Sequence, residues 1–265
     1  MHVTVFGLGE AGALLAADLS TAGVDVTGFD PAPVATPEGV ARSPDAAAAV
    51  ADADIVLIVT GAPQAADVFD RIVAHLPADC LVADLSTSAP DAKAARAASA
   101  AAADRSFVDV ALMAPVPGRG LGTPSLASGA GAERYGAAMR PLGAPVELVG
   151  ERAGAASTRK LLRSVTMKGL ASVVIEALRA AERAGFSDWL WSDLVAEFES
   201  ADEALLRRLV HGTGVHARRR VHEMEASAEM LDSLGIEPLM TRATIESLRV
   251  AARDGVPVVP NQAKS

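Results

Sequence analysis

The chain has 265 residues, of which 50% are hydrophobic and 22% are charged, so it can bury a large core and is not disordered throughout. Its formal net charge of −9 argues against a general nucleic-acid binder, and its single cysteine, Cys80, excludes an intramolecular disulfide and a cysteine-based zinc site. The opening residues lack the pattern of a secretory signal, and no apolar run approaches the roughly 20 residues of a membrane span. We therefore expect a globular, cytoplasmic protein.

The first half of the chain alternates short apolar runs with alanine-rich helical stretches. Strands are expected at His2–Phe6, Val24–Phe29, Ile55–Val59, Cys80–Asp84, Ser106–Val110 and Pro145–Val149. Helices are expected between them, at Glu10–Ala22, Pro44–Ala51, Pro63–His75 and Pro90–Ala103. This alternation predicts a mostly parallel sheet with right-handed crossovers, so residues 1–150 are expected to form a doubly wound α/β domain of the Rossmann type.

From residue 151 onward, the apolar residues recur with a helical period. One long helix is expected over Arg152–Ala184, followed by helices at Ser187–Ser200, Ala201–Val210, Val215–Leu234 and Thr241–Arg253. The one strand-like run in this half is Val256–Val259. The sequence therefore predicts an all-α second domain, residues 151–265, joined to the first by the long helix.

A glycine-rich motif follows the first predicted strand and opens an amphipathic helix. It fits the pattern G-x-G-x-x-G, and its residues are Gly7, Leu8, Gly9, Glu10, Ala11 and Gly12. In this context the first glycine makes a tight turn, the second lets a pyrophosphate approach the backbone, and the third lets helix and strand pack closely. The free N–H groups at the start of the helix favour phosphate binding. The motif predicts a dinucleotide site, and a glycine-rich turn formed by chance is the alternative.

Asp30 ends the second predicted strand, where an acidic residue binds ribose hydroxyls in sites of this kind. Its carboxylate would repel a 2′-phosphate, and the next arginine along the chain is Arg42, so NAD is favoured over NADP as the cofactor. NADP stays an alternative, because a basic residue could be brought near when the chain folds back. An Asp-Pro turn at Asp30 and Pro31 is the other explanation of this residue.

Thr60 and Gly61 follow the predicted strand Ile55–Val59, at the carboxyl edge of the sheet. Open α/β sheets bind their ligands at this edge, so both residues are candidates to contact the cofactor on its nicotinamide side. A simple loop leading to a helix that starts at Pro63 has the same sequence pattern.

Three further segments carry a resemblance to a known family. Asp84-Leu85-Ser86-Thr87 ends a strand, Phe107-Val108-Asp109 lies in the next one, and Lys160 lies on the long helix. In this order the chain resembles the β-hydroxyacid dehydrogenase superfamily, which includes 3-hydroxyisobutyrate dehydrogenase and 6-phosphogluconate dehydrogenase. Its C-terminal half looks most like a poorly characterised phosphogluconate-dehydrogenase-like branch. The resemblance implies a homodimer with intertwined helical domains, and a cleft between the domains where a lysine handles the hydroxyl proton of a small substrate.

The family motifs match this chain in part. The resemblance implies that Ser86 and Thr87 contact the substrate and that Lys160 is the catalytic lysine, while Ser164 stands where the family has an asparagine. The family's Ser-Gly-Gly loop, which grips the carboxylate end of the substrate, corresponds to the segment starting at Met113, which reads Met-Ala-Pro. Proline has no N–H to donate, so this departure argues against the usual small hydroxyacids as substrates.

Ordinary acid–base chemistry also points to the long helix. Alcohol oxidation needs a base, and the ordinary lysine pKa of about 10.4 is too high for that role unless burial beside the nicotinamide ring lowers it. Ser164 lies one turn after Lys160 on the same face and can hold the substrate oxygen, and Lys168 lies about two turns on and can edge the same pocket. A solvated surface charge is the alternative explanation for both lysines.

Two other groups of polar residues are open to two explanations each. Ser86 and Thr87 stand at a strand end where ligands bind, or in a cap of the next helix, for which Ser88 is better placed. His216 and Arg219 share one helix face, which is either solvated and ion-paired or closes the partner's pocket around an anionic substrate group. No set of His, Asp and Glu has the spacing of metal ligands, so no metal is expected.

These features together predict an NAD(P)-dependent oxidoreductase. It would transfer a hydride between the cofactor and a hydroxyacid, or a related small hydroxyl or carbonyl compound, with a lysine as general acid and base. Two alternatives stay open. One is an imine reductase of the same fold, although these enzymes usually lack the lysine, and the other is a non-catalytic dinucleotide-binding protein.

Overall fold

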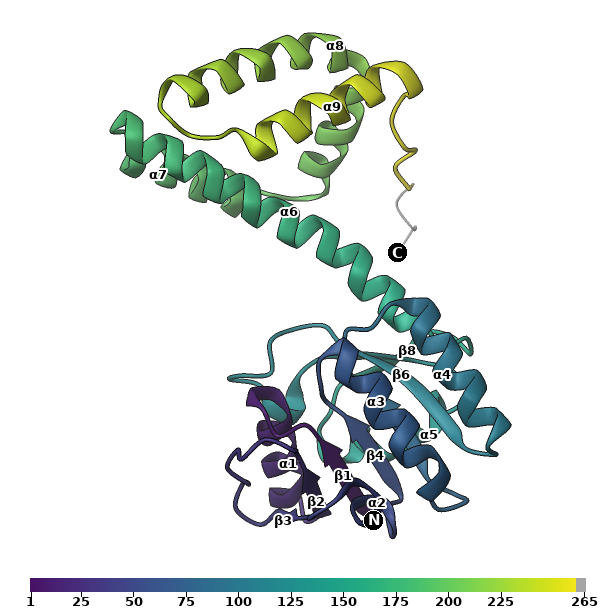
Figure 1. Cartoon of the computed structure of the whole chain (residues 1–265). Helices are drawn as coiled ribbons and strands as arrows, with labels where there is room; N and C mark the ends of the chain where they lie inside the picture. Colours follow the sequence, from purple (N-terminus) through teal and green to yellow (C-terminus); the bar gives the residue numbers. More distant parts are fainter. Residues whose placement is uncertain (261–265) are drawn as a thin grey trace. The chain divides into compact units, whose positions relative to one another are not determined.

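The computed structural model describes residues 1–260, which separate after Arg163 into two compact units. The first unit, Met1–Arg163, contains every strand of the described chain, and the second unit, from Ser164 onward, is helical (Figure 1). None of the helices in residues 1–260 is long and apolar enough to cross a membrane.

The first unit is built on an 8-stranded sheet in the order β3-β2-β1-β4-β5-β6-β7-β8. Its strands are β1 (His2–Phe6), β2 (Asp25–Phe29), β3 (Ala41–Arg42), β4 (Ile55–Ile58), β5 (Leu81–Asp84), β6 (Ser106–Leu112), β7 (Ser125–Ser128) and β8 (Val146–Leu148). Neighbouring strands are parallel except β6 and β7, which are antiparallel. The order of the strands reverses between β1 and β4, and parallel sheets bind ligands beside such a reversal.

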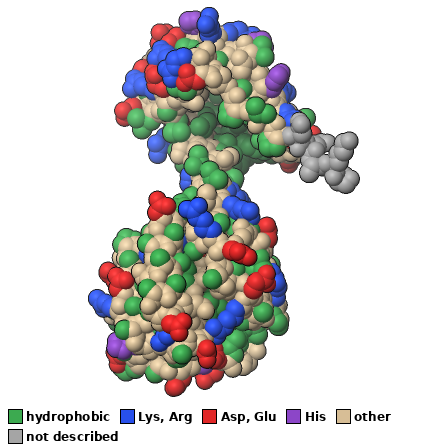
Figure 2. All heavy atoms as spheres, turned by 90° about the vertical axis from the view of Figure 1, so that its right-hand side faces the viewer, with side chains coloured by type: hydrophobic (Ala, Val, Ile, Leu, Met, Phe, Trp, Pro, Cys, Tyr) green, Lys and Arg blue, Asp and Glu red, His purple; other side chains and the backbone are tan. Residues whose placement is uncertain are grey.

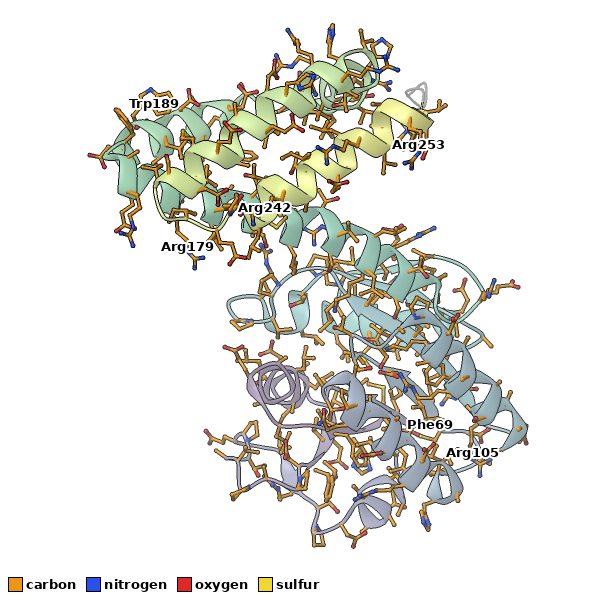
Figure 3. All side chains as sticks on the ribbon, turned by 45° about the horizontal axis from the view of Figure 1, so that its top comes forward. Phe69, Arg105, Arg179, Trp189, Arg242 and Arg253 are labelled. Atoms are coloured by element: carbon orange, nitrogen blue, oxygen red, sulfur yellow. The ribbon has the colours of Figure 1, made fainter. Side chains whose placement is uncertain are left out.

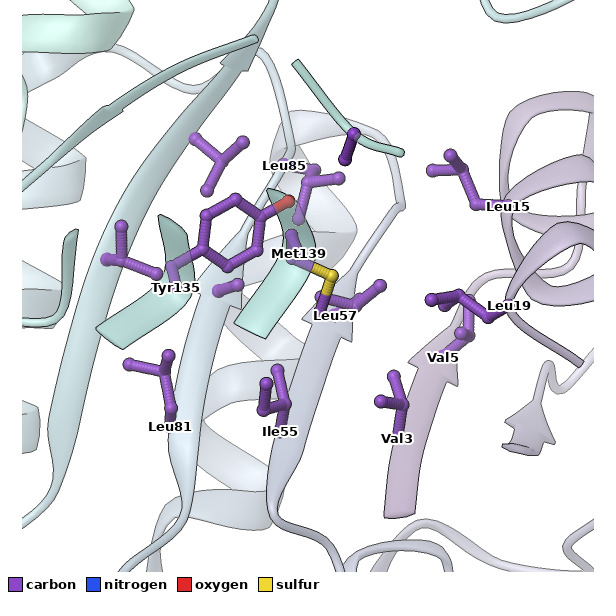
Figure 4. Packing of buried hydrophobic residues seen from close by; sticks show 14 of the residues in the cluster. Val3, Val5, Leu15, Leu19, Ile55, Leu57, Leu81, Leu85, Tyr135 and Met139 are labelled. Carbon is purple, nitrogen blue, oxygen red and sulfur yellow. The ribbon is translucent and has the colours of Figure 1, made fainter. Parts of the chain in front are cut away.

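Helices cover both faces of this sheet, which confirms the predicted doubly wound fold. They are α1 (Glu10–Thr21), α2 (Ala46–Val50), α3 (Ala62–Ile72), α4 (Pro90–Ala102) and α5 (Ala132–Met139), with 3-10 turns at Val73–His75, Gly120–Gly122 and Arg140–Leu142. In β4, Ile55 and Leu57 pack with α1 and α5 on one face (Figure 4), and Val56 and Ile58 pack with α2 and α3 on the other. Because both faces are buried, β4 is apolar at every position.

Three elements of the first unit were not expected from the sequence. The strand β3 has only 2 residues, and β7 has the polar-ended sequence Ser-Leu-Ala-Ser, so neither shows an apolar strand pattern. The helix α5 is 8 residues long and contains Gly136, which weakens its helical pattern. The antiparallel β7 is held by its pairing with β6, a long-range interaction that local sequence patterns do not reveal.

The second unit consists of four helices within the described residues. The helix α6 (Ala155–Ala184) starts in the first unit and continues into the second, followed by α7 (Ser187–Glu199), α8 (Glu203–Ser233) and α9 (Leu239–Asp254). The predicted all-α character is confirmed, and a small core of Val221, Ala228, Ile245 and Leu248 packs α8 against α9.

One prediction for this unit is wrong. The separate helices expected at Ala201–Val210 and Val215–Leu234 are one continuous helix, α8, in which Thr213 donates its hydroxyl to the Leu209 carbonyl across the glycine-rich junction. Glycine lowers helix propensity without forbidding a helix, so the junction did not end it. The run Val256–Val259 forms no strand, because it lies in the extended tail after α9 without a partner strand.

Candidate functional site

The glycine-rich turn between β1 and α1 has the geometry that its sequence predicts. Gly7 has φ +91°, and a Cβ there would lie 2.6 Å from the Val59 carbonyl oxygen. A Cβ on Gly12 would lie 1.8 Å from the Gly7 carbonyl oxygen, so helix and strand approach too closely for any other residue. A Cβ on Gly9 would meet no atom of the described chain within 4 Å. The first and third glycines are therefore needed by the fold, and the second faces open space.

A pocket of about 400 Å³ adjoins this turn, at the carboxyl ends of β1, β2 and β4. It brings together five of the residues that the sequence singled out for the cofactor, namely Gly7, Gly9, Asp30, Thr60 and Gly61. Leu8, Glu10, Ala11 and Gly12 belong to the same turn and helix start but do not line the pocket. The lining residues that the sequence did not indicate are Phe6, Phe29, Pro31, Ala46, Val59, Gln64, Asp67, Val68 and Arg71.

The start of α1 suits a phosphate group. Gly9 is the N-cap, and it has no side chain that could accept the first N–H groups of the 12-residue helix. Such unsatisfied N–H groups and the helix dipole attract anions. The open side at Gly9 and the adjoining pocket thus fit the pyrophosphate and adenosine of a dinucleotide.

Asp30 links the pocket wall to the glycine-rich turn. Its Oδ2 accepts the Leu8 N–H at 2.8 Å, and its Oδ1 accepts the Ala32 N–H at 2.9 Å. Arg42 does fold back toward Asp30, but its guanidinium donates to the carbonyl oxygens of Asp30, Ala32 and Val34 at 2.6 to 2.8 Å. The arginine therefore holds the loop after β2 together, and most of its N–H groups are already occupied.

The candidate substrate turn after β5 is mostly buried. Ser86 is 4% exposed, its hydroxyl lies 2.8 Å from the Ser88 hydroxyl, and its N–H donates to Asp84 Oδ1 at 2.9 Å. Thr87 between the two serines is exposed. The prediction that Ser88 caps α4 is wrong, because Ala89 is the N-cap and the Ser88 hydroxyl pairs with Ser86 instead.

Sequence patterns missed a set of charged residues on the inner face of α4. Lys93 and Arg96 are buried against the sheet, where helices of this kind usually present apolar side chains. A signal did exist, since apart from Pro90 at its start α4 contains no apolar residue larger than alanine, so the side chains long enough to reach the sheet are charged. Burial lowers the pKa of Lys93 below its ordinary value, and the nearby Asp84 and Asp109 carboxylates oppose this shift.

The other candidate catalytic residues lie along α6. Lys160 is half-buried in the second turn of this helix and belongs to the first unit. Ser164 and Lys168 lie on the part of α6 that belongs to the second unit, where the serine is half-buried and the lysine is exposed.

Met113 occupies a loop whose backbone is already engaged. Its N–H donates to the Pro124 carbonyl at 2.8 Å, and its carbonyl oxygen accepts from Arg163 Nη1 at 2.7 Å. Its side chain packs against the apolar cluster of Ala111, Leu126 and Ala156. The Met113 N–H is therefore not available to bind a substrate carboxylate.

His216 and Arg219 are both exposed on α8. Arg219 Nε lies 3.4 Å from Glu223 Oε1, an ion pair within the helix. This contact matches the solvated, ion-paired explanation of the face. Within residues 1–260, no three His, Cys, Asp or Glu side chains lie close enough to hold a metal ion.

The second unit has an apolar pocket of its own, of about 430 Å³, between α6, α7, α8 and α9. Figure 2 shows apolar side chains lining a hollow of this unit, and Trp189, labelled in Figure 3, belongs to the pocket. Glu176 borders it and accepts the N–H groups of Met240 and Thr241 at 2.7 and 2.8 Å. Burial raises the pKa of Glu176, but hydrogen bonds from the Thr241 side chain and from the start of α9 outweigh it, so the net shift is downward.

Comparison with known families matches most of the chain in two parts. The profile described as the NAD binding domain of 6-phosphogluconate dehydrogenase matches residues 2–144, more than half of the chain. A second profile, a domain of unknown function (DUF1932), matches residues 181–250 in the helical unit.

Individual relatives agree with these matches. A probable 3-hydroxyisobutyrate dehydrogenase of Mycobacterium tuberculosis is 30% identical over 198 residues, which cover 70% of this chain and 65% of that protein. A conserved hypothetical protein from Sinorhizobium meliloti, of known structure, is 30% identical with a TM-score of 0.61, covering 100% of this chain and 91% of that one. An imine reductase from Myxococcus stipitatus in complex with NADP+ has a TM-score of 0.81 at 19% identity, covering 97% and 96% of the two chains, and so shares the fold. The chain spans 42% to 65% of the length of the curated relatives that it matches.

Proposed function

The chain belongs to the β-hydroxyacid dehydrogenase-like superfamily and carries its NAD-binding domain, and from this premise we propose that it is an NAD(P)-dependent oxidoreductase. The substrate is a small hydroxyl compound or the matching carbonyl. The single observation that carries the proposal is the turn at Gly9, which is open to a ligand on one side and lies beside a pocket that Asp30 lines. NAD is the preferred cofactor, because the Asp30 carboxylate would repel a 2′-phosphate and Arg42 is engaged with carbonyl oxygens.

The bound dinucleotide supplies or accepts a hydride, and a residue of the chain has to accept or donate the hydroxyl proton of the substrate. We assign this task to Lys160, whose amine takes the hydroxyl proton during oxidation and whose ammonium returns it during reduction. The support for this assignment is that Lys160 matches the catalytic lysine of the family in position and is half-buried on α6. Ser164, one helical turn later, orients the substrate oxygen by a hydrogen bond in this proposal.

The cofactor and the substrate class can be tested in one screen. Nicotinamide absorbance is followed with NADH, NADPH and their oxidised forms against hydroxyacids, semialdehydes and imines. We expect turnover with NADH or NAD+ and at least one hydroxyacid or semialdehyde. Tight NADH binding without turnover of any class would favour the non-catalytic alternative.

The role of Lys160 is tested by replacing it with methionine. Lys160→Met should lower the turnover rate by roughly 10² to 10⁴, the usual effect of losing a positioned acid–base group, and should leave NADH affinity nearly unchanged. One ionisation in the pH profile of the wild type should vanish. Arg159→Met is the matched control, because Arg159 is the exposed neighbour on the same helix. If Lys168→Ala abolishes turnover while Lys160→Met does not, the acid–base role belongs to Lys168.

Imine reduction is a second candidate function, and the loop at Met113 favours it. The Met113 N–H, which could otherwise donate to a carboxylate, is engaged within the first unit, and Pro115 two residues later has no N–H. A substrate without a carboxylate therefore suits this loop better than a small hydroxyacid does. Faster turnover of imines than of semialdehydes, with Lys160→Met still active, would support this candidate.

We also propose that the active form is a homodimer assembled through the helical unit. The support is the amount of exposed apolar surface, which includes Trp189 at 64%, Trp191 at 56% and Val165 at 75% exposure. Apolar surface on this scale is typical of an interface. In such a dimer, His216 and Arg219 of one copy would be candidates to bind an anionic substrate group of the other.

A further inference from the structure

Four charged side chains are buried together inside the first unit. Asp84 ends β5, Asp109 lies in β6, and Lys93 and Arg96 come from α4, the helix that connects these two strands. The side chains of Lys93, Asp84 and Asp109 are all 0% exposed. Two cations face two carboxylates, so the cluster is electrically balanced.

Lys93 is the member that contacts both carboxylates. Its Nζ lies 2.9 Å from Asp84 Oδ1 and 3.4 Å from Asp109 Oδ1, and it donates to the Asp84 carbonyl oxygen at 2.6 Å. The ammonium, which has three N–H donors and no acceptor, is therefore surrounded by three oxygens, two from carboxylates and one from the backbone. Arg96 pairs with Asp84, with its Nε 2.8 Å from Oδ2.

Each carboxylate in turn holds a segment that carries a candidate site residue. Asp84 Oδ1 accepts the N–H of Ser86 at 2.9 Å, which fixes the turn after β5. Asp109 Oδ2 accepts the N–H groups of Gly154 and Ser157 at 3.0 Å each, at the start of α6.

The start of α6 is held on the other oxygen of Asp109 as well. Oδ1 accepts the Ser157 hydroxyl at 2.6 Å, and the Ser128 hydroxyl bridges Oδ2 to the Ala156 N–H. Asp109 therefore acts as the cap of α6 from a strand far away in the sequence, and Lys160 lies one turn beyond this anchor.

Stability alone does not explain why these groups are charged. Apolar side chains of the same size often stabilise a core as well as a buried ion pair does, because burial removes the charges from water. An apolar side chain at position 93, however, could not bind two carboxylates that each hold a separate backbone segment. Lys93 therefore links the turn after β5 to the start of α6, which an apolar side chain could not do.

We propose that Lys93 is a positioning residue for the reaction, which ties the turn that holds Ser86 to the start of the helix that carries Lys160. The inference rests on the proposed function, since that function gives Ser86 and Lys160 their roles. Lys93 itself touches neither substrate nor cofactor in this proposal. Its effect is to keep the two segments in one arrangement while the substrate is turned over.

The first test needs no substrate. In Lys93→Met, hydrogen exchange of backbone amides, followed by mass spectrometry, should become at least tenfold faster in two segments at once, residues 85–89 and residues 154–160. Exchange in β4 (Ile55–Ile58) should stay as in the wild type, and so should NADH affinity measured by fluorescence. Ser99→Ala is the matched control, because Ser99 is exposed on the same helix. Faster exchange in only one segment, or in neither, would overturn the link.

The second test separates positioning from charge balance. Lys93→Met leaves one carboxylate in excess, whereas Lys93→Met combined with Asp109→Asn restores a balanced cluster and keeps an oxygen to cap α6. Both variants are assayed with the hydroxyacid, semialdehyde or imine that the wild type turns over best. We expect the double variant to regain thermal stability, while its kcat stays at least tenfold below that of the wild type and its KM for NADH stays within twofold.

The outcomes distinguish this inference from the function on which it rests. If the double variant regains both stability and kcat, Lys93 serves charge balance only and the inference is wrong. If Lys93→Met does not fold, both the hydrogen exchange and the kinetics are measured on the double variant. If the wild type turns over no compound of the screen with either nicotinamide cofactor, the proposed function fails and the role of Lys93 fails with it, whatever the exchange data show.

Discussion

The two units of the chain differ in how completely each covers its own apolar side chains. The first unit buries large apolar residues on both faces of its sheet. The second has one small core, and apart from Met1, Leu14 and Leu162, every exposed large apolar side chain within residues 1–260 belongs to it. The first unit even buries charged groups, and it pairs them.

This difference indicates which unit covers its apolar side chains without a second copy of the chain. A unit that covers its apolar side chains in its own core can fold by itself. A unit that leaves tryptophan and branched aliphatic side chains exposed needs a further surface against them. Cofactor binding should therefore depend on the first unit, and assembly on the second.

The largest expected effect comes from a substitution at the tightest backbone contact of the first unit. In Gly12→Ala, the new Cβ would collide with the Gly7 backbone oxygen, which cannot move aside as a flexible side chain can. We expect the free energy of unfolding to fall by roughly 2–3 kcal/mol, measured by urea denaturation, together with a loss of NADH binding.

Gly9→Ala is the matched control for this prediction. Gly9 has φ −67° and an open side, so alanine fits its backbone and meets no neighbour. Stability should change by less than about 0.5 kcal/mol, while NADH affinity falls because the methyl group occupies the open side. Equal loss of stability in both variants would contradict the separation of fold and binding roles among the glycines.

The second prediction concerns the proposed homodimer, which two substitutions in the helical unit should dissociate. Val165→Glu combined with Trp191→Glu places charges on the exposed apolar surface of the helical unit, where burial in an interface would desolvate them. We expect the dissociation constant of the dimer to rise about thirtyfold, roughly 2 kcal/mol. Light scattering should then give the 27.0 kDa mass of one chain instead of twice that mass.

A surface variant outside the helices controls for added charge. Val258 is 95% exposed in the tail, so Val258→Glu should leave the mass and the NADH affinity of the wild type unchanged. A wild type that scatters as a single chain at micromolar concentration would refute the proposed dimer directly.

The third prediction concerns the acid sensitivity of the second unit. Hydrogen bonds from Thr241 and the start of α9 lower the pKa of Glu176, so the folded state gains stability above the ordinary glutamate pKa and loses it as the pH falls through the lowered value. Glu176→Gln should cost about 1–2 kcal/mol at pH 7 and should flatten the loss of stability that occurs as the pH falls below the ordinary glutamate pKa. Both tryptophans, Trp189 and Trp191, lie in this unit, so their fluorescence follows its unfolding.

The smallest expected effect concerns the preference of the first unit for NADH over NADPH. Asp30→Ala removes the negative charge that disfavours a 2′-phosphate, and the preference for NADH over NADPH should shrink by roughly 1 kcal/mol, about fivefold. Fluorescence titration with both cofactors measures this change. Tighter binding of NADPH than NADH by the wild type would contradict the assignment of Asp30.

Sequence patterns predicted the parts of the fold and site that depend on local geometry. The glycine-rich turn could be located because backbone sterics restrict which residues fit there, and Asp30 because it ends the strand that follows this motif. The strand β7 could not, because its pairing with β6 is long-range. Lys93 was missed for a similar reason, since hydrophobic periodicity does not reveal which charged side chains meet inside a core.

The order of strands in the sheet has a consequence for aggregation. Its two edge strands are β3, with 2 residues, and β8, with 3 residues, and they carry Arg42 and Glu147. Short, charged edges present few unpaired backbone groups to another chain. Sheet-to-sheet growth, the route toward fibrils, is therefore disfavoured at both ends, so copies of the first unit should not associate through the edges of their sheets.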